Sequence, residues 1–371
     1  MFIGGGIGSA GAINIQVDGI VTTAGNQSVG NVFGGRDQTD AISLTGGTAA
    51  GSHARMSAGG SQSLYTSANL SLAGGIGDGS GAALLSGTGQ NLTVRGLLSM
   101  VGGSGSAPGA NETAIRNNTS GTQNINVTGN LSVTGGGFGS DTWVKQNGSG
   151  NQSITVGGNL ALLAPASTPS TGVTSIESQG FGQTLFLGGA LSIDNQAGWL
   201  TYIASSGTQL ISADSIAIRL SSAAPVTGAF AGISATGNQT INLQGDGTTI
   251  GTATLSLVNT SSLSGSLAAV KTAADQVILM DYDSADLVRI GSTAGLGATE
   301  ISAQGTHTMV AGQLLIQGGD SVAATAGIYV PNGAAVISTL YGPIEILGGA
   351  HGAAVIDPPQ LDMVSNNGVF L

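Results

Sequence analysis

A short phrase recurs along this chain about every thirty residues, and it constrains the fold more than any other feature. The phrase reads GTQNINVTGNLSVTGG at 121–136 and TGQNLTVRGLLSMVGG at 88–103. Related copies read GSQSLYTSANLSLAGG at 60–75 and GNQSITVGG at 150–158. A period of this length is typical of solenoids and related repeat architectures, in which each unit stacks on the next.

A glutamine marks most copies, and successive glutamines are about 26 to about 37 residues apart. His307 takes the same place in GTHTMVAGQLLIQGG, whereas the copy that ends at Gly349 lacks the glutamine. We expect these side chains to stack as a structural ladder in which each amide binds the next, as amide ladders do in cross-β structures. The predicted ladder residues are Gln62, Gln90, Gln123, Gln152, Gln183, Gln209, Gln239, Gln276 and His307.

Each unit contains stretches with the two-residue period of a β-strand. Ile125 and Val127 alternate with polar residues, and Leu131 and Val133 do the same after a polar break. A third, weaker stretch precedes each glutamine, as at 113–116. Glycine is 65 of the 371 residues, which argues against helices. The sequence therefore predicts three short strands in each unit.

Such strands cannot bury their apolar sides within one unit, but stacked units can bury them in a common interior. The sequence thus predicts an all-β fold, a right-handed parallel β-helix (β-solenoid) of roughly 10–11 coils, with about 30 residues per coil. We expect one elongated domain over 1–371. Within it we predict irregular coils at 1–60, regular coils at 61–350 and an end segment at 351–371, where Pro358-Pro359 is a candidate stop.

Composition excludes several classes of function. Charged residues are 7% of the chain and the net charge is −11, so a basic nucleic-acid-binding surface is not expected. There is no cysteine, and no apolar run is long enough for a membrane-spanning helix. The first residues lack the pattern of a signal peptide, so we expect either a piece of a longer chain or export by another route.

The sequence pattern Gln-x-Ile-x-Val, followed by Gly-x-Leu-x-Leu-x-Gly-Gly, resembles the repeats of filamentous-haemagglutinin-type proteins of Gram-negative bacteria. The resemblance spans most of residues 10–350. It implies a parallel β-helix with an extracellular or surface-attached role in adhesion or in a fibre, and similar repeats occur in biofilm matrix proteins. That family is usually far longer than 371 residues, and its amino-terminal secretion domain is not recognisable here.

Few residues suggest catalysis or metal binding. The densest acidic cluster is Asp281-Tyr282-Asp283-Ser284-Ala285-Asp286, followed by Arg289. Asp281 and Asp283 would point the same way from a strand, as a pair for glycan cleavage or for Ca²⁺, although a solvated acidic turn is the simpler interpretation. The segment at 74–79, which resembles a single copy of the calcium-binding Gly-Gly-x-Gly-x-Asp motif, suggests no site, and neither do the three histidines, His53, His307 and His351. We therefore predict no catalytic residue, no cofactor and no metal.

Two further residue classes leave alternatives open. Asn-x-Ser/Thr sequons could accept glycans, or they could simply belong to the repeat; they begin at Asn26, Asn69, Asn91, Asn130, Asn151 and Asn238. The scarce aromatic residues could stack on glycans, or they could fill the core and cover corners. They include Phe138 and Trp143, which we place in the loop after a Gly-Gly pair, and Phe181, Phe186, Trp199 and Tyr202.

The sequence thus favours a non-catalytic extracellular or cell-surface β-solenoid of structural or adhesive type. Open strand edges at the ends of a solenoid are templates for pairing, so the expected partner is another copy of the chain, end to end or laterally, with cell-surface glycans as a second possibility. The alternative function is a polysaccharide-binding or polysaccharide-cleaving β-helix, such as a lyase, hydrolase or depolymerase.

Overall fold

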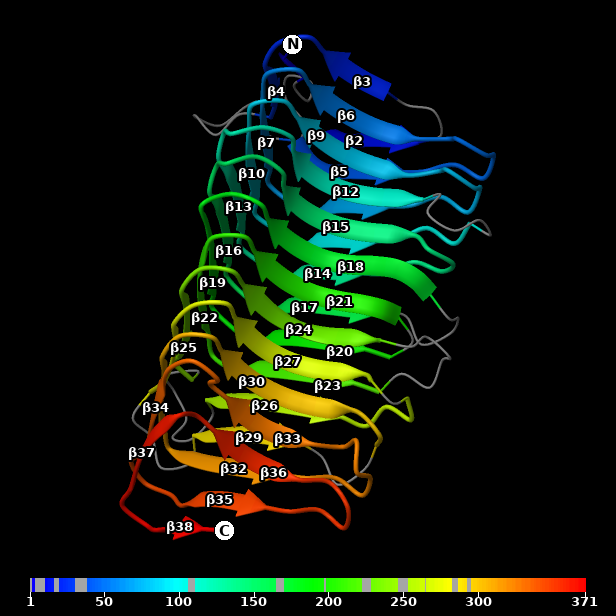
Figure 1. The fold of residues 1–371 in the computed structure, drawn as a ribbon. Helices are drawn as coiled ribbons and strands as arrows, with labels where there is room; N and C mark the ends of the chain where they lie inside the picture. The colour runs from blue at the N-terminus through cyan, green and yellow to red at the C-terminus, as the bar shows by residue number, and fades with distance from the viewer. Residues whose placement is uncertain are drawn as a thin grey trace. The chain divides into compact units, whose positions relative to one another are not determined.

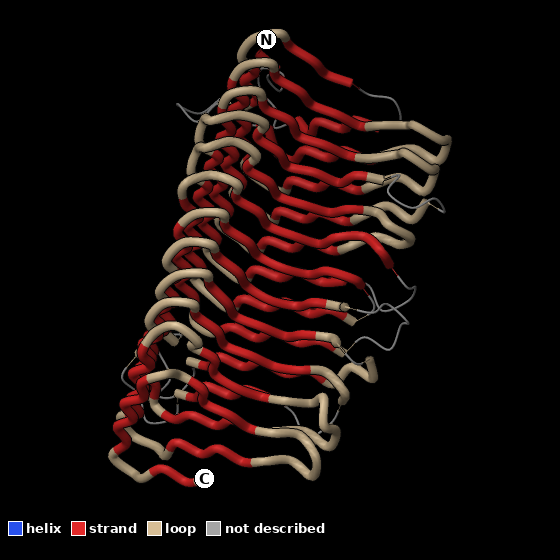
Figure 2. The backbone as a smooth tube through the Cα atoms, viewed as in Figure 1, coloured by secondary structure: helices blue, strands red, loops and turns tan. Residues whose placement is uncertain are grey.

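The computed structural model describes twelve stretches of the chain. They are residues 2–3, 11–16, 20–30, 39–105, 111–164, 170–196, 198–221, 228–245, 253–263, 265–281, 286–291 and 295–371. These stretches contain strands, turns and bends, and no helix is found in them (Figure 2). The predicted all-β class is confirmed. The same described residues include no helix long and apolar enough to cross a membrane.

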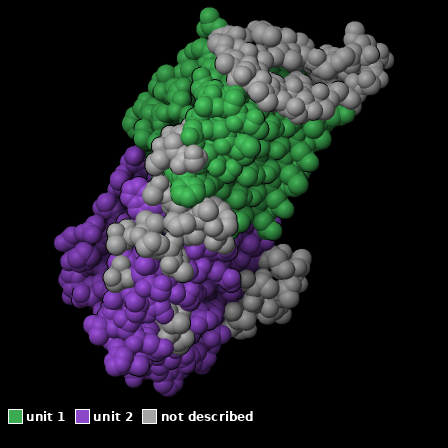
Figure 3. Space-filling model, turned by 90° about the vertical axis from the view of Figure 1, so that its right-hand side faces the viewer, with its two compact units in different colours: residues 1–185 green, residues 186–371 purple. Residues whose placement is uncertain are grey.

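The chain divides into two compact units, residues Met1–Leu185 and Phe186–Leu371 (Figure 3). In each unit three parallel sheets receive strands in rotation, so that every third strand joins the same sheet. Each unit is therefore a parallel β-solenoid with about thirty residues per turn, as the repeat period predicts.

The first unit builds its three sheets from strands β1 to β18. Its first sheet contains β1 (Phe2–Ile3), β4 (Gln27–Val29), β7 (Ser61–Thr66), β10 (Gly89–Val94), β13 (Gln123–Val127) and β16 (Gln152–Val156), and then β19 (Gly182–Leu187), within which the boundary between the units falls. Its second sheet contains β2 (Gly11–Gln16), β5 (Thr39–Thr45), β8 (Leu70–Ala73), β11 (Leu98–Val101), β14 (Leu131–Thr134) and β17 (Leu160–Ala164). Its third sheet contains β3 (Ile20–Thr23), β6 (Ala54–Ala58), β9 (Ala82–Ser86), β12 (Glu112–Asn117), β15 (Asp141–Gln146) and β18 (Ser170–Ser178) (Figure 1).

The second unit repeats this arrangement. Its first sheet contains β22 (Thr208–Ala213), β25 (Gln239–Leu243), β28 (Gln276–Met280), β31 (His307–Ala311), β34 (Ala334–Thr339) and β37 (Gln360–Ser365). Its second sheet contains β20 (Leu191–Asn195), β23 (Ile216–Leu220), β26 (Thr254–Asn259), β29 (Leu287–Gly291), β32 (Gln313–Gln317), β35 (Ile344–Leu347) and β38 (Val369–Phe370). Its third sheet contains β21 (Gly198–Ser205), β24 (Phe230–Ala235), β27 (Leu267–Thr272), β30 (Ala298–Ala303), β33 (Ala326–Tyr329) and β36 (Ala354–Asp357).

Equivalent residues of successive repeats lie opposite one another. In the pairing of β10 with β13, Gln90 is opposite Gln123 and Leu92 is opposite Ile125. The expectation that each strand pairs in parallel with its copy one turn away is confirmed. The weaker stretch before each glutamine is also a strand, as β12, β18 and β24 show.

Alternation along each strand separates a buried interior from the surface. In β13 the side chains of Gln123, Ile125 and Val127 are buried, and the two asparagines between them are exposed. In β14, Leu131 and Val133 are likewise buried. Full burial of one such apolar side chain stabilises the fold by about 1.5–3 kcal/mol. The interior of each unit is therefore the principal source of its stability.

The Gly-Gly pairs of the repeat are explained by close contact between turns. A Cβ added at Gly74 would lie 2.4 Å from the backbone N of Gly103, and one at Gly102 would lie 2.2 Å from the backbone N of Gly136. None of these four residues has a positive φ. At this corner the sequence needs glycine because backbones of successive turns touch there.

The last twenty residues continue the winding. Residues 354–371 form β36, β37 and β38, each paired with the strand one turn earlier. Pro358-Pro359 lies at the corner between β36 and β37, so the prolines do not stop the chain from forming further strands. A proline at a corner lacks only an N–H that the sheets do not use.

Candidate functional site

The predicted ladder glutamines lie in register inside each unit. In the first unit, the amide nitrogens of Gln62, Gln90, Gln123, Gln152 and Gln183 each donate to the amide oxygen of the glutamine one turn earlier, over 2.7–2.8 Å. In the second unit, Gln239 donates to Gln209 over 2.7 Å and Gln276 donates to Gln239 over 2.6 Å. Each bond satisfies buried polar atoms, so these side chains are committed to the fold and are not accessible to a ligand.

The first member of this column is a residue that sequence reasoning missed. Gln27 accepts the bond from Gln62 and is itself buried. The phrase Gly-Asn-Gln-Ser occurs both at 25–28 and at 150–153, so a comparison of these two copies could have identified Gln27.

His307 occupies a ladder position and is chemically different from its neighbours. It lies opposite Gln276 and is fully buried. Neither ring nitrogen has a hydrogen-bond partner among the described residues, and the amide oxygen of Gln276 has none either. Burial lowers the pKa of His307 to about 4, so the imidazole is neutral at pH 7. This is a break in the ladder, enclosed by the core.

Several sequon asparagines stabilise the turns. The side-chain oxygen of Asn26 accepts from the backbone N–H of Ser61 over 2.9 Å. Asn69 accepts from Leu97 over 2.9 Å and Asn130 accepts from Asn159 over 2.8 Å. These bonds join one turn to the next, which is a structural role for asparagine at this repeat position.

The predicted acidic cluster is only partly visible. Residues 282–285, which include Tyr282 and Asp283, lie outside the described residues. Asp286 is buried, and its carboxylate accepts from the backbone N–H of Ala253 over 3.2 Å. No group of three His, Cys, Asp or Glu side chains suited to a metal ion occurs in the described parts, which include residues 74–79 and the three histidines.

Trp143 is not in a loop, as we expected, but in strand β15. Its indole packs against Ala83, Leu85 and Ala114 on the outer side of the third sheet of the first unit. The strand was hidden because a long polar corner separates it from the Gly-Gly pair. Phe138 does lie in that corner, with a φ of 37° and half of its side chain exposed.

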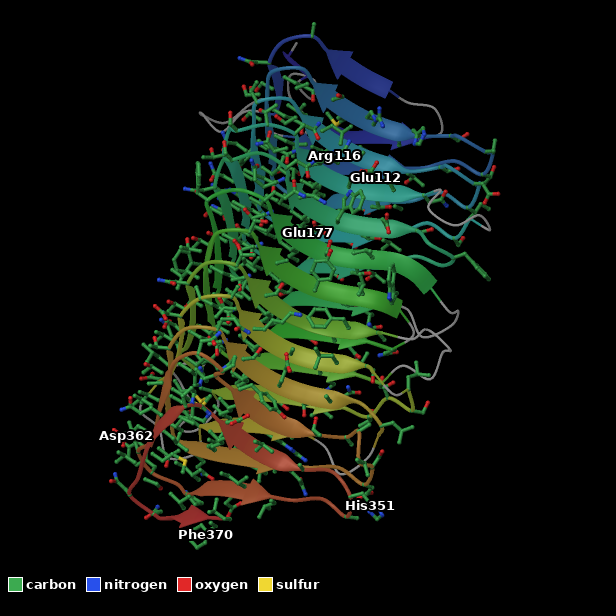
Figure 4. The ribbon with its side chains drawn as sticks, viewed as in Figure 1. Glu112, Arg116, Glu177, His351, Asp362 and Phe370 are labelled. Atoms are coloured by element: carbon green, nitrogen blue, oxygen red, sulfur yellow. The ribbon has the colours of Figure 1, made fainter. Side chains whose placement is uncertain are left out.

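Charged side chains surround Trp143. Its indole N–H donates to Glu112 over 2.9 Å, and Glu112 also pairs with Arg116 at 3.1 Å. Lys145 pairs with Glu177 at 2.8 Å and lies 5.2 Å from the centre of the indole ring. Figure 4 shows Glu112, Arg116 and Glu177 along this sheet. Since each of these charges is paired within the cluster, we assign the cluster to the stability of the sheet surface.

Asp141 lies at the edge of the same cluster. Burial raises the pKa of Asp141 above its usual range, and the nearby Glu112 and Glu177 add to this rise. A hydrogen bond from the backbone N–H of Val173, 2.9 Å long, acts in the opposite direction. The carboxylate thus joins two turns, like the asparagines above.

The third sheet of the second unit has a different outer face, which is hollowed. One hollow of about 410 Å³ is lined by apolar and aromatic side chains, with Tyr202, Phe230 and Leu267 prominent. A second hollow of about 500 Å³ is lined mainly by polar groups. Ser234 and Lys271 line both, so we treat the two hollows as one feature, the third-sheet groove. Its volume is in the range of small-molecule and glycan sites.

The floor of this groove follows from period-two alternation. In β24, Ala231 and Ile233 point into the core, which leaves Phe230, Gly232 and Ser234 on the outside. A Cβ at Gly232 would lie 2.6 Å from the Phe230 ring. The absence of a side chain at Gly232 therefore allows the ring to pack against the backbone of its own strand.

Side-chain contacts between neighbouring strands hold the lining of the third-sheet groove in place. The rings of Tyr202 and Phe230 are 6.3 Å apart at an interplanar angle of 52°, and Lys271 lies 4.9 Å from the centre of the Phe230 ring. Ser302 donates to the carboxylate of Glu300 over 3.3 Å on the neighbouring strand β30. Sequence reasoning named Tyr202 but missed Phe230, Lys271 and Glu300.

No protein-family model matches this chain, and no curated protein or solved structure matches it either.

Proposed function

We propose that the chain is a non-catalytic structural and adhesive solenoid, located outside the cell or on its surface, that assembles with further copies of itself end to end. The resemblance of its repeats to filamentous-haemagglutinin-type adhesins supports this proposal. So does its surface, in which charged residues are scarce and Ser, Thr and Asn occupy the outward positions of strands such as β13 and β16.

The observation that carries the proposal is the exposure of apolar side chains in the turn formed by residues 354–371. Ala335, Ile337 and Ile344 point into the interior and are fully buried, because a further turn covers them. Their neighbours one turn later, Leu361 and Val369, are 38% and 39% exposed. Within residues 354–371 the inward apolar side chains are therefore less covered than in the turn before, beside strands whose outer edges are unpaired among the described residues.

A second copy fits this surface better than an unrelated partner. Each turn already pairs in parallel and in register with the next, so the first turn of another copy would meet the same geometry of strands and apolar side chains. A contact between two different surfaces of identical chains does not close on itself, and so it produces a filament.

The test combines negative-stain electron microscopy with sedimentation velocity over a range of protein concentrations. We expect filaments or a concentration-dependent rise in mass, and we expect Leu361→Glu to abolish both by placing a charge at the open interior. Val364→Glu is the matched control, because Val364 is on the same strand and points outward. Single short particles at every concentration, or a Leu361→Glu variant that assembles like the parent, would contradict the proposal.

The proposed location has its own test. Antibodies raised against the purified chain should label intact, unpermeabilised cells of the source organism. Labelling that appears only after permeabilisation would argue for a location inside the cell.

A further inference from the structure

We propose that the third-sheet groove of the second unit binds an uncharged oligosaccharide. This site is separate from the surfaces used in end-to-end assembly, and the inference does not depend on that assembly. It rests on the shape of the groove, its aromatic floor, its polar rim and its charge.

The shape of the groove suits an extended ligand. Its lining comes from four neighbouring strands, with Tyr202 on β21, Phe230 on β24, Lys271 on β27 and Glu300 on β30. Because neighbouring strands are about 4.8 Å apart, four strands span about 15 Å. A ligand that crosses them needs several linked rings or residues, and a single small metabolite would leave most of this length empty.

The apolar half of the groove offers a stacking surface. Tyr202 and Phe230 are half-buried and line the same hollow, with Leu200 and Leu267 beside them. Aromatic rings bury a large apolar area, and tyrosine adds a hydroxyl group at its tip. The C–H face of a pyranose ring is the flat, weakly apolar surface that packs on such rings.

The other half of the groove is rich in neutral hydrogen-bonding groups. Its outward side chains carry hydroxyl groups and one amide, from Ser206, Ser234, Thr236, Ser302 and Gln304. The hydroxyl groups of Ser205 and Thr272 are buried and donate to backbone oxygens, so they belong to the fold. A hydroxyl group both donates and accepts, and an amide does the same through separate atoms. Sugar hydroxyl groups have this dual character, so an apolar floor beside such a rim matches the two sides of a saccharide.

Charge selects among saccharides. The residues that line the two hollows include one cation, Lys271, and one carboxylate, Glu300, which balance each other. The chain as a whole has a net charge of −11, which repels polyanions. An acidic polysaccharide or a nucleic acid would therefore bind poorly, whereas an uncharged glycan meets no such penalty. A pair of carboxyl groups would serve glycoside hydrolysis. Glu300 is the one carboxylate among the described residues that line the groove, which supports binding rather than cleavage.

Local packing is the alternative explanation for these aromatic residues, and the chain contains a control for it. Tyr329 lies on the outer face of the same sheet, over Gly327, where an added Cβ would be 2.9 Å from the ring. It thus covers backbone as Phe230 does, but it does not line either hollow. Substituting Tyr329 reports the effect of losing a covering ring without losing the groove.

The experiment begins with the purified full chain on a printed array of neutral and acidic glycans. A neutral polysaccharide that binds is then cast into native gels, and its affinity for each variant is taken from the retardation of the protein band. We expect Phe230→Ala and Tyr202→Ala each to weaken binding about tenfold or more, as loss of a central aromatic contact does at other interfaces. Phe230→Tyr should retain most of the affinity, since it keeps the ring.

The controls separate binding from folding. Tyr329→Ala should bind like the parent chain, and so should Arg219→Gln, which removes an exposed cation from the second sheet. Circular dichroism and melting curves should show that every variant is folded. The proposal is overturned if no neutral glycan binds, if only acidic glycans bind, or if Tyr329→Ala loses as much affinity as Phe230→Ala. Filament formation is measured in a separate experiment. A failure of glycan binding can therefore be told apart from a failure of end-to-end assembly.

Discussion

His307 shows how one residue can interrupt a repeated interaction without disrupting the fold. The histidine keeps its register opposite Gln276, and the strand β31 around it is regular. What is lost is hydrogen bonding, because the two ring nitrogens and the amide oxygen of Gln276 are buried and have no partner within the described parts of the chain. Unsatisfied buried polar groups reduce stability, by about 1–3 kcal/mol for each group that loses its partner.

The first prediction concerns the repair of this break. His307→Gln should restore the amide ladder and raise the free energy of unfolding at pH 7 by about 1 kcal/mol, the usual net value of one internal hydrogen bond. The measurement is equilibrium unfolding in urea, with Gln276→Ala as a comparison that removes a ladder amide and should destabilise the chain. A His307→Gln variant less stable than the parent would mean that the imidazole makes packing contacts that glutamine cannot replace.

The second prediction concerns pH. The pKa of His307 is lowered from 6.5 to about 4 by burial, so the unfolded chain binds a proton between these values and the folded chain does not. Stability should therefore fall as pH drops from 6.5 towards 4, by on the order of 3 kcal/mol in total. Carboxylates also titrate in this range, so the quantity to compare is the pH dependence of the parent chain against that of His307→Gln. Identical slopes would rule out the histidine as the cause.

At the scale of the element, each strand performs two tasks with alternate residues. Inward residues are similar from turn to turn, because each packs against the equivalent residue of the turns above and below. Ile125, for example, lies opposite Leu92 and Ile154. Outward residues are free to differ, and the third sheet uses this freedom to carry a charged cluster around Trp143 in one unit and a groove around Phe230 in the other.

The Gly-Gly corner gives a third prediction. Gly102→Ala should destabilise the first unit by about 1–3 kcal/mol, because its Cβ would lie 2.2 Å from the backbone N of Gly136 and backbone cannot move aside cheaply. Gly89→Ala is the matched control, since its Cβ would be 3.5 Å from the nearest atom and its φ is not positive. That control should be neutral or slightly stabilising. Thermal melting of both variants checks the difference.

How far the sequence predicts this structure depends on whether a residue belongs to the repeat. Gln123 and Ile125 recur in most units, so their strands, parallel pairing and burial could be deduced from comparison of the chain with itself. Phe230 and Lys271 recur in none, and their proximity depends on which strands the winding places side by side. Trp143 was misplaced for a related reason, since the corner before it varies in length and obscures the start of the strand.

At the scale of the whole molecule, the low content of charge affects assembly. The net charge of −11 is spread over 371 residues, so copies that approach end to end repel each other weakly and at long range. The exposed apolar side chains at residues 354–371 supply a short-range attraction.

The fourth prediction follows from this balance. Filament formation should increase between about 0.01 M and about 1 M NaCl, over which the screening length falls from about 30 Å to about 3 Å. Light scattering at a fixed protein concentration measures the change. Leu361→Glu should remain unassembled across the series, and assembly that declines with salt would indicate that ion pairs, rather than apolar contact, join the copies.

The amide column has one more consequence, because all its dipoles point the same way. From Gln62 to Gln183 in the first unit, and at Gln239 and Gln276 in the second, the ladder nitrogen donates towards the amino-terminal side. Among the described residues, the amide nitrogen of Gln27 and the amide oxygen of Gln276 have no hydrogen-bond partner, so the ends of these columns differ. A fibre made of such chains, joined end to end, would be a polar filament. Its two tips would differ chemically, and each would be expected to recruit new subunits at its own rate.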